Sequence, residues 1–405
     1  MSNTEVISTS FEPGAAVKEG TVPLCVPELG GNEWLYVKEC LDTNWVSSAG
    51  PFVSRFEQSL ASYVSADHAI ATVNGTAALH VALIAAGVKR DDEVILPSLS
   101  FIAPANAVRY AGAWPVFMDV EAEHWQIDPQ KTADFIDREC DWKDGELRNR
   151  NTGRRVSALL PVHILGHPVD LDPLIELARK FDLALIEDAT ESLGAKYKGR
   201  MLGQTSDIAC FSFNGNKLIT TGGGGMIVTR KKVWADHARY LTTQAKDNPI
   251  EYIHNEVGFN YRLTNLQAAL GCAQVEQLDE FLFRKRRIAQ QYNEALLDLP
   301  GVSTLKEAAW ATSACWLHTV LIDPAAYSID RFELFRLLAE RDIQARPLWQ
   351  PLHRSPAHSE SPAYYVEVAD EIHRRALSLP SSVGLSEQEM ARVVKVIRDG
   401  AQQSA

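Results

Sequence analysis

The sequence predicts an α/β protein with one mostly parallel sheet of about seven strands and a smaller C-terminal α+β domain. The first observation behind this prediction is the length of 405 residues, which exceeds the usual size of one compact domain. The second is the alternation of short apolar runs with helical patterns in the part before Thr264. The third is a change of pattern after Thr264, where a long helix precedes a mixture of strand and helix.

Seven apolar runs supply the strands of the predicted sheet. Each is nearly continuous in apolar residues, as expected for parallel strands with helices on both faces. They begin near residues 69, 93, 115, 156, 183, 207 and 224. No segment of helical length separates the last two, so we expect them to pair as an antiparallel hairpin. The charged stretch at residues 137–155 is expected to be a solvated surface loop.

The remaining elements divide the chain. From Thr264 to about Leu297 the apolar residues recur at helical spacing, which predicts one long helix bridging two lobes. A strand at His318–Ile322 and an amphipathic helix at residues 331–341 predict a smaller α+β lobe. We therefore expect an N-terminal arm at residues 1–30, a large domain at 31–285 and a small domain at 286–405.

Composition and charge disfavour several classes of partner. The formal net charge is -12, from 52 acidic and 40 basic residues, so no general positive field exists to attract nucleic acid. The six cysteines are scattered and have no histidines at zinc spacing, which predicts a cytoplasmic protein without a metal site. The polar N-terminus lacks a signal-like apolar core, and no apolar run is long enough to predict a membrane span.

A carboxylate and a lysine follow two of the predicted strands. Asp188 ends the strand that begins near residue 183, and Lys217 lies in the loop after the strand near residue 207. Ligands bind at the carboxyl ends of strands in open α/β sheets, so we expect both side chains in one crevice. There the carboxylate can keep a cofactor ring protonated while the lysine forms an imine with a carbonyl cofactor. Taken singly, a helix-capping aspartate and a solvated lysine are the commoner interpretations.

An anion site is expected near the first strand. The sequence Asn74-Gly75-Thr76 lies between that strand and an alanine-rich helix. Gly75 allows close approach of the backbone, and the free N–H groups of a helix N-terminus bind anions. Ser212, on the strand before Lys217, is expected to add a hydroxyl group. The alternative is an ordinary strand-to-helix turn.

Several motifs together resemble one known family. In chain order they are NWVSSAGPFVSRFE, NGTAALHVAL, LPSLSFIAPANAV, PVHILGHPVD, IEDATESLGA, FSFNGNK, GFNYRLTNLQAA and RPLWQPLH. With them the chain resembles the DegT/DnrJ/EryC1/StrS sugar aminotransferases, which are fold-type I enzymes dependent on pyridoxal 5′-phosphate (PLP). The resemblance runs from about Val22 to the C-terminus, so it covers nearly all of the chain.

The resemblance implies roles at the cofactor site. Lys217 matches the lysine that forms the Schiff base with PLP, and Asp188 matches the carboxylate that pairs with the pyridine nitrogen. Gly75, Thr76 and Ser212 match the phosphate cradle. The implied reaction is a transamination in which L-glutamate donates the amino group, a keto sugar accepts it and Lys217 moves the proton.

Further positions follow from the same resemblance. Phe101 matches an aromatic residue that packs on the cofactor ring. Asn260 matches an asparagine that reaches the phosphate of the neighbouring subunit, so a homodimer with shared active sites is expected. Glu191 stands where many members have a glutamine near the cofactor hydroxyl, and its negative charge would raise the pKa of the imine. The alternative for Glu191 is an exposed helix carboxylate.

The departures from the family pattern also suggest a branch. The run Gly222–Gly225 stands where many members have Gly-Glu-Gly-Gly. With Glu191 and the sequences ECLDTNWVSS and FNGNKLITTGGGG, this run resembles the branch that makes 4-amino sugars for legionaminic-acid-type sugars. The substrate pocket is expected to contain Trp45, Ser47, Ser48, His163 and the segment from Arg346 to His353. Arg346 suits a carboxylate or phosphate, because its guanidinium is planar and always charged.

The sequence leaves three reactions open, two aminations and one dehydration. The first choice is amination of a UDP-linked 4-keto-6-deoxy-N-acetylhexosamine for a bacterial surface glycan. The alternative is amination of 3-deoxy-octulosonate oxidised at C8, which would supply lipopolysaccharide. A PLP-dependent sugar dehydratase is the alternative of another class, and Lys217 disfavours it because such relatives carry a histidine at this position. The net charge disfavours a regulatory protein with a DNA-binding segment.

Overall fold

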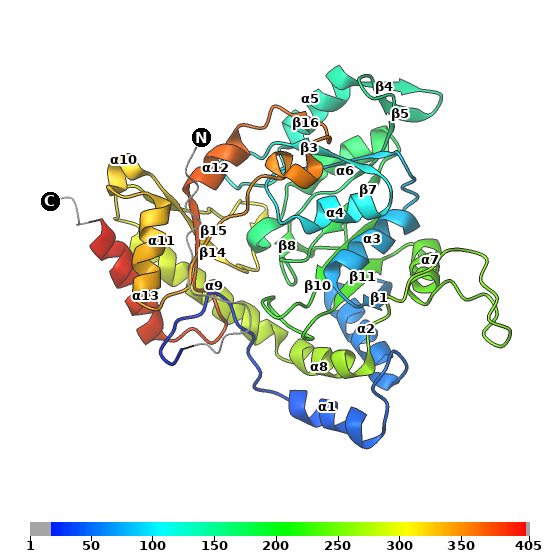
Figure 1. Ribbon diagram of the computed structural model, residues 1–405, viewed down its shortest axis with the longest axis horizontal. Coiled ribbons are helices and arrows are strands. Elements are labelled where there is room, and N and C mark those ends of the chain that lie inside the picture. Colours follow the sequence, from blue (N-terminus) through cyan, green and yellow to red (C-terminus); the bar gives the residue numbers. More distant parts are fainter. Residues whose placement is uncertain (1–17, 402–405) are drawn as a thin grey trace.

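One large sheet forms the centre of the protein, whose computed structural model describes residues 18–401 (Figure 1). The 10-stranded sheet has a path in the order β1-β11-β10-β7-β6-β2-β3-β16, and the hairpin β4–β5 is attached to β6. Along this path all neighbours are parallel except at β11, which runs antiparallel to β1 and β10. The α/β class predicted from the sequence is therefore confirmed.

All seven predicted strands are present in this sheet. With three additional strands, the bounds are β1 (His68–Thr72), β2 (Glu93–Pro97), β3 (Trp114–Met118), β4 (Cys140–Lys143), β5 (Glu146–Asn149), β6 (Arg155–Leu159), β7 (Ala184–Asp188), β10 (Ile208–Ser212), β11 (Gly225–Thr229) and β16 (Ala363–Tyr364). The expected antiparallel pairing of β10 with β11 is confirmed. The stretch expected to be a loop at 137–155 instead contains the hairpin β4–β5, because Cys140 and Leu147 bury apolar side chains there.

Helices cover both faces of the large sheet. The helices that pack on one face are α2 (Pro51–Val64), α5 (Pro129–Glu139), α6 (Leu171–Lys180) and α8 (Asn265–Val275). Those on the other face are α3 (Gly75–Ala85), α4 (Ala103–Tyr110), α7 (Lys232–Thr242) and α12 (Val368–Arg375). The helix α1 (Glu33–Asp42) packs against α8 at one edge (Figure 1). Because both faces are buried, the strands show the continuous apolar runs seen in the sequence.

The single long helix predicted from Thr264 to about Leu297 is wrong. Two helices, α8 and α9 (Leu278–Leu296), occupy this range. A capping box starts α8, in which the Thr264 side chain accepts from the backbone N–H of Gln267. Gln277 leaves helical geometry, with φ -107° and ψ 0°, and separates the two helices. The apolar spacing continues across this break, so the periodicity did not reveal it.

A second core lies in the C-terminal part of the chain. Its four-stranded sheet has the order β12-β14-β17-β15. The bounds are β12 (Val302–Thr304), β14 (His318–Ile322), β15 (Arg346–Pro347), β17 (Ala376–Leu379), α10 (Pro324–Tyr327), α11 (Arg331–Glu340) and α13 (Glu387–Gly400). The strand and helix expected here are both confirmed. Val22, from the expected arm, packs into this core and bridges to Ile343, whereas residues 1–17 of that arm lie outside the described residues.

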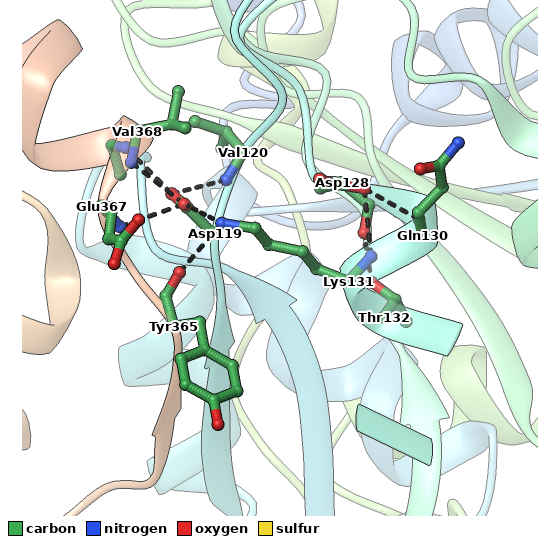
Figure 2. A network of polar contacts seen from close by, with 10 residues as sticks. Asp119, Val120, Asp128, Gln130, Lys131, Thr132, Tyr365, Glu367 and Val368 are labelled. Atoms are coloured by element: carbon green, nitrogen blue, oxygen red, sulfur yellow. Dashed lines mark hydrogen bonds and ion pairs between the residues drawn. The ribbon is translucent and has the colours of Figure 1, made fainter. Parts of the chain in front are cut away.

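One segment of the C-terminal part returns to the large sheet, where β16 pairs with β3 and α12 packs on the sheet. The buried carboxylate of Asp119, at the end of β3, fixes this return (Figure 2). It accepts hydrogen bonds from three backbone N–H groups at the start of α12, those of Glu367, Val368 and Ala369. The Lys131 ammonium lies 2.6 Å from the same carboxylate. The predicted domain boundary at residues 285 and 286 stays a prediction.

Short elements complete the fold. A three-stranded sheet of order β13-β8-β9 consists of β8 (Lys196–Tyr197), β9 (Arg200–Met201) and β13 (Ala311–Thr312). The 3-10 turns are η1 (Ile164–Gly166), η2 (Leu352–Arg354) and η3 (Pro356–His358). Within residues 18–401, no helix combines the length and apolar character that crossing a membrane requires.

Candidate active site

A cavity of about 260 Å³ opens where β1, β7 and β10 end. This edge of an open α/β sheet is where ligands bind. The cavity is lined by Asn74, Gly75, Thr76, Leu79, Phe101, Ala103, Thr190, Glu191, Ser212, Asn214, Asn216, Lys217, Trp316 and Trp349. We call Gly75, Thr76, Glu191, Ser212 and Lys217 the polar wall, and Trp316 with Trp349 the tryptophan wall. Every residue of the polar wall was predicted from the sequence as a cofactor residue, and the structure brings them together.

Lys217 lies in a tight turn directly after β10. Its backbone N–H donates to the carbonyl of Asn214 at 3.0 Å, which closes the turn. The Nζ atom lies 3.5 Å from Oε1 of Glu191 and 4.1 Å from the ring centroid of Trp316. Only 14% of the side chain is exposed. The amine is therefore held inside the cavity, in contact with both walls.

Two buried carboxyl groups lie beside Lys217. Asp188 ends β7 beneath the cavity, and its Oδ1 accepts the backbone N–H of Thr190. Glu191 accepts the backbone N–H of Leu165 at 2.8 Å. Burial raises the pKa of both groups above their ordinary values, although Lys217 favours their ionised forms. A cationic group placed next to Asp188 would offset the cost of burying its charge.

The start of α3 forms a cradle for an anion. The side chain of Asn74 caps the helix by accepting the N–H of Ala77 at 2.8 Å, while the first N–H groups of a helix have no intrahelical partner. A Cβ atom added to Gly75 would lie 2.8 Å from Cβ of Ser212, a distance too short for real contacts. Only glycine therefore allows the helix start to approach β10 this closely. The arrangement places N–H groups and the Ser212 hydroxyl around one space.

Phe101 and Asn260 were predicted from the family resemblance and lie in different places. Phe101 follows β2 and lines the cavity with 54% of its surface exposed. Asn260 lies outside the lining of the cavity, in an exposed segment that bridges to Thr243. Its predicted contact with a neighbouring subunit stays a prediction.

His163 does not line the cavity, contrary to the expectation from its place at a strand end. Its side chain has no exposed surface. Its Nδ1 accepts the backbone N–H of Val169 at 3.0 Å, and its Nε2 lies 2.9 Å from the carboxylate of Glu187. Both ring nitrogens are therefore occupied, and the residue holds β6 and β7 segments together beneath the site.

The loop with Trp45, Ser47 and Ser48 also lies outside the cavity lining. Its backbone carbonyls are fixed by donors from elsewhere in the chain. Asn265 donates its side-chain amide to Trp45 and its backbone N–H to Ser47, and Arg262 donates to Ser48. The Trp45 side chain is 53% exposed. A substrate contact from these residues stays a prediction.

The two named ends of the predicted segment Arg346–His353 do not line the cavity, although Trp349 between them does. Arg346 is exposed on β15 and donates to the carbonyl of Ala345. His353 is half-buried, with Nδ1 2.7 Å from the hydroxyl of Ser98. This segment therefore reaches the site through its aromatic residue, and substrate binding by the other two stays a prediction.

Trp316 was missed by the sequence reasoning, whereas Trp349 lies in the segment Arg346–His353 that was expected at the substrate pocket. The rings of Trp316 and Trp349 are nearly parallel, at 11°, with centroids 6.5 Å apart. Trp316 also donates its ring N–H to the carbonyl of Asn216 at 2.7 Å. The motif RPLWQPLH contains Trp349, so its place in that motif was a usable signal. Trp316 had no comparable signal, because CWLH resembles the start of an ordinary buried strand.

The described residues fit PLP. The start of α3 with Ser212 suits the phosphate, and Asp188 suits a protonated ring nitrogen. Lys217 is the buried amine within reach of the same space. A Cβ atom at Gly75 would clash with the Ser212 side chain, so only glycine lets the start of α3 lie this close to the Ser212 hydroxyl. The chain's own residues thus suit the phosphate, the ring nitrogen and the carbonyl carbon of the cofactor.

Comparison with known proteins agrees with this geometry. The model of the DegT/DnrJ/EryC1/StrS aminotransferase family matches residues 27–398. The chain is 38% identical to a protein named GDP-perosamine synthase from Escherichia coli O157:H7, over 93% of this chain and 98% of that one. It is 39% identical to a GDP-perosamine synthase from Caulobacter vibrioides, over 93% of this chain and 97% of that one. The solved structure of DesI in the presence of its TDP-sugar product is 28% identical, with a TM-score of 0.85, and the match covers 96% of this chain and 95% of that one.

The chain therefore belongs to the DegT/DnrJ/EryC1/StrS aminotransferase family, as its motifs indicate. It is a PLP-dependent sugar aminotransferase with the fold-type I architecture. The family, the enzyme class and the cofactor predicted from the sequence are confirmed. The legionaminic-acid branch, suggested by Glu191 and by Gly222–Gly225, stays a prediction.

Proposed function

From this family membership, we propose that the chain transfers an amino group from L-glutamate to the 4-keto carbon of a nucleotide-linked 6-deoxy sugar for a bacterial surface glycan. The observation that carries the acceptor class is the similarity to two proteins named GDP-perosamine synthase, because this name describes a GDP-linked amino sugar. The TDP-sugar product of DesI supports a nucleotide-linked acceptor. A GDP-linked acceptor is therefore the first candidate, ahead of the UDP-linked N-acetylhexosamine expected from the sequence.

The residues of the polar wall divide the work of this reaction. PLP, when bound, acts as an electron sink and carries the amino group between donor and acceptor. Lys217 would hold the cofactor through its amine and, once the donor has freed that amine, would move the proton at the substrate carbon. Asp188 would pair with the ring nitrogen and keep it protonated, and Gly75, Thr76 and Ser212 would hold the phosphate. Burial of Lys217 keeps water away from the proton that it moves.

We also propose a homodimer in which Asn260 completes the site of the partner subunit. The support is the exposed apolar surface near Asn260, where Ile250 is 86% and Val257 82% exposed. Mixing Asn260→Ala with Lys217→Ala subunits tests this proposal, since a mixed dimer has one site with both residues intact. Activity that reappears on mixing supports shared sites, and two inactive pools that stay inactive contradict them.

We further propose a cytoplasmic location. All six cysteines are free, which supports it.

The acceptor is tested in a half-reaction. The protein is loaded with pyridoxamine 5′-phosphate, freed of excess cofactor and mixed with one keto sugar at a time. A GDP-linked 4-keto-6-deoxyhexose is expected to restore PLP absorbance and to yield an amino sugar by mass spectrometry. The UDP-linked 4-keto-6-deoxy-N-acetylhexosamine is the second arm, and the Lys217→Ala variant is the control for uncatalysed exchange. Absence of an amino sugar in both nucleotide arms would contradict the proposal.

The alternatives give distinct outcomes in the same assay. Amination of 3-deoxy-octulosonate oxidised at C8, with no reaction of nucleotide-linked sugars, would assign the enzyme to the free sugar acid. A product that has lost a hydroxyl group without gaining nitrogen would identify a PLP-dependent sugar dehydratase. Lys217 disfavours that second outcome, because its amine is buried beside the cofactor space.

A further inference from the structure

The helix α9 carries a lysine whose ammonium group is buried near the active site. Lys285 is 1% exposed, and its Nζ donates to the backbone carbonyls of Trp316, at 2.5 Å, and of Ser381. Its Nζ also lies 4.0 Å from Sγ of Cys25. Within residues 18–401, no carboxylate forms an ion pair with it, and burial lowers its pKa. Such a group costs several kcal/mol to bury, so its contacts need an explanation.

Both carbonyls that Lys285 binds lie in irregular segments. Trp316 comes two residues before β14 begins at His318, and Ser381 comes two residues after β17 ends at Leu379. Neither carbonyl takes part in the pairing of these two strands. A buried carbonyl without a donor is destabilising by about 1–3 kcal/mol. Lys285 therefore supplies the donor that the sheet does not.

The ring of Trp316 contacts the loop that carries Lys217. The Trp316 ring N–H donates to the carbonyl of Asn216 at 2.7 Å, and the ring lies against Nζ of Lys217 at 4.1 Å. The thiol of Cys25 donates to the same Asn216 carbonyl at 3.2 Å. One tryptophan thus connects the buried ammonium of Lys285 on its backbone side with the Lys217 loop on its ring side.

We propose that Lys285 is a positioning residue, which fixes Trp316 and through it the orientation of the Lys217 amine. The chain of contacts is Lys285 Nζ to the Trp316 carbonyl, and then the Trp316 ring to Asn216 and Lys217. Loss of either link lets the amine leave the geometry in which it attacks the aldehyde of PLP. This inference rests on the proposed role of Lys217. A lysine that only fills space in the core would change stability and leave the reactivity of Lys217 unchanged.

The test measures the reactivity of Lys217 without any turnover. Apoprotein is incubated with saturating PLP and cyanoborohydride, and the rate at which the reduced cofactor appears on the Lys217 peptide is followed by mass spectrometry. Displacement by about 1 Å can slow a reaction about a hundredfold, so Lys285→Met is expected to slow labelling between about tenfold and a hundredfold. Trp316→Phe, which lacks the ring N–H, is expected to slow it in the same range. Because both act through one link, the double variant should be no slower than the slower single variant.

Controls separate position from stability and from the proposed function. Lys395→Met, at an exposed lysine of α13, and Trp142→Phe, at an exposed tryptophan of β4, should label at the wild-type rate. Unchanged labelling of Lys217 in folded Lys285→Met overturns the inference. If that variant does not fold, Trp316→Phe decides alone, because it keeps both carbonyl contacts of Lys285. Absence of label on Lys217 in the wild type would instead overturn the proposed function.

Discussion

The polar wall and the tryptophan wall meet at Lys217 but are built from different kinds of structure. The polar wall uses the ends of regular elements, since Gly75 opens α3 and Ser212 ends β10. The tryptophan wall uses irregular segments, with Trp316 before β14 and Trp349 after β15. The ends of helices and strands fix the polar-wall residues relative to the sheet. The tryptophan rings lie on irregular segments, and their positions depend on contacts such as the hydrogen bond from Lys285 to the carbonyl of Trp316.

The polar wall should also differ in its contribution to stability from the Asp119 anchor, which lies outside the cavity lining. In and beneath the polar wall, burial raises the pKa of Glu191 and Asp188, so their charges are held at a cost. At the Asp119 anchor, the carboxylate accepts three backbone hydrogen bonds at the start of α12, which offset the cost of burying its charge (Figure 2). We therefore expect changes at the polar wall to reduce activity, and changes at the Asp119 anchor to reduce stability.

The largest effect on activity is expected from the substitution Lys217→Ala. Loss of the proton carrier should reduce the rate of both half-reactions by about 10²–10⁴-fold, because that is the range of general acid–base catalysis. The rates are measured by stopped-flow absorbance with each substrate in turn. Lys38→Ala, at an exposed lysine paired with Asp42, is the matched control. A Lys217→Ala protein that keeps more than about a tenth of the wild-type rate would break the assignment of chemistry to the polar wall.

Asp188→Asn sharpens the comparison by separating activity from stability. The rate should fall about 10²–10³-fold, as for loss of one preorganised electrostatic group. Burial raises the pKa of Asp188 in the folded protein, so its charge costs stability at neutral pH. The thermal unfolding temperature of apo Asp188→Asn should therefore equal or exceed that of the wild type. A clear fall in that temperature would show that Asp188 stabilises the fold; Asp172→Asn, in an exposed pair with Lys198, is the control.

Gly75→Ala tests the close approach of α3 to β10. The new methyl group would lie 2.8 Å from Cβ of Ser212, and such overpacking costs about 1–3 kcal/mol. The dissociation constant of PLP, measured by absorbance titration, should rise about fivefold to a hundredfold. Gly215→Ala is the matched control, because a Cβ atom there meets nothing within 4 Å. A dissociation constant for Gly75→Ala equal to that of Gly215→Ala would contradict the steric explanation.

The smallest effect on activity is expected from Asp119→Asn, which weakens the anchor of α12. Burial alone would raise the pKa of Asp119, but the Lys131 ammonium and three backbone N–H groups outweigh it and lower the pKa. The variant should lose about 1–3 kcal/mol of unfolding free energy at pH 7, measured with urea, and keep its activity.

The same anchor predicts a pH dependence. A folded-state pKa below the ordinary value means that the carboxylate of Asp119 stabilises the fold above about pH 4, and that this contribution is lost as the pH falls through the folded-state pKa. The difference between the wild type and Asp119→Asn should therefore shrink below about pH 4. A difference that stays constant with pH would contradict the role of the charge. Asp137→Asn, at an exposed aspartate of α5, is the control.

Local patterns predicted part of the cofactor site, whereas Glu191 was identified only from the family resemblance and is buried rather than exposed. Asp188 and Ser212 end apolar strands, and Gly75 lies at a strand-to-helix turn, so the rule for strand ends brings them together. The seven main strands were predictable for a similar reason, since both faces of the sheet are covered and the runs are continuous. Local patterns were therefore sufficient for the strands and for these residues at strand ends.

Other features depend on contacts that local patterns do not report. The break between α8 and α9 at Gln277 interrupts no apolar period, so one long helix was expected. His163 has the strand-end signal of a site residue, but the carboxylate of Glu187 and the backbone of Val169 hold its ring in the interior. Trp316 enters the site from a segment that precedes a strand of the C-terminal core. In each case the deciding partner lies elsewhere in the fold.

The most direct test of the central claim is to find the residue that bonds to PLP. The loaded protein is reduced with borohydride and digested, and the cofactor-bearing peptide is sequenced by mass spectrometry. The account predicts one labelled lysine, Lys217, and prior incubation with L-glutamate should remove that label because the donor displaces the lysine. A label on another lysine, or a label on Lys217 that the amino donor does not affect, would contradict the account.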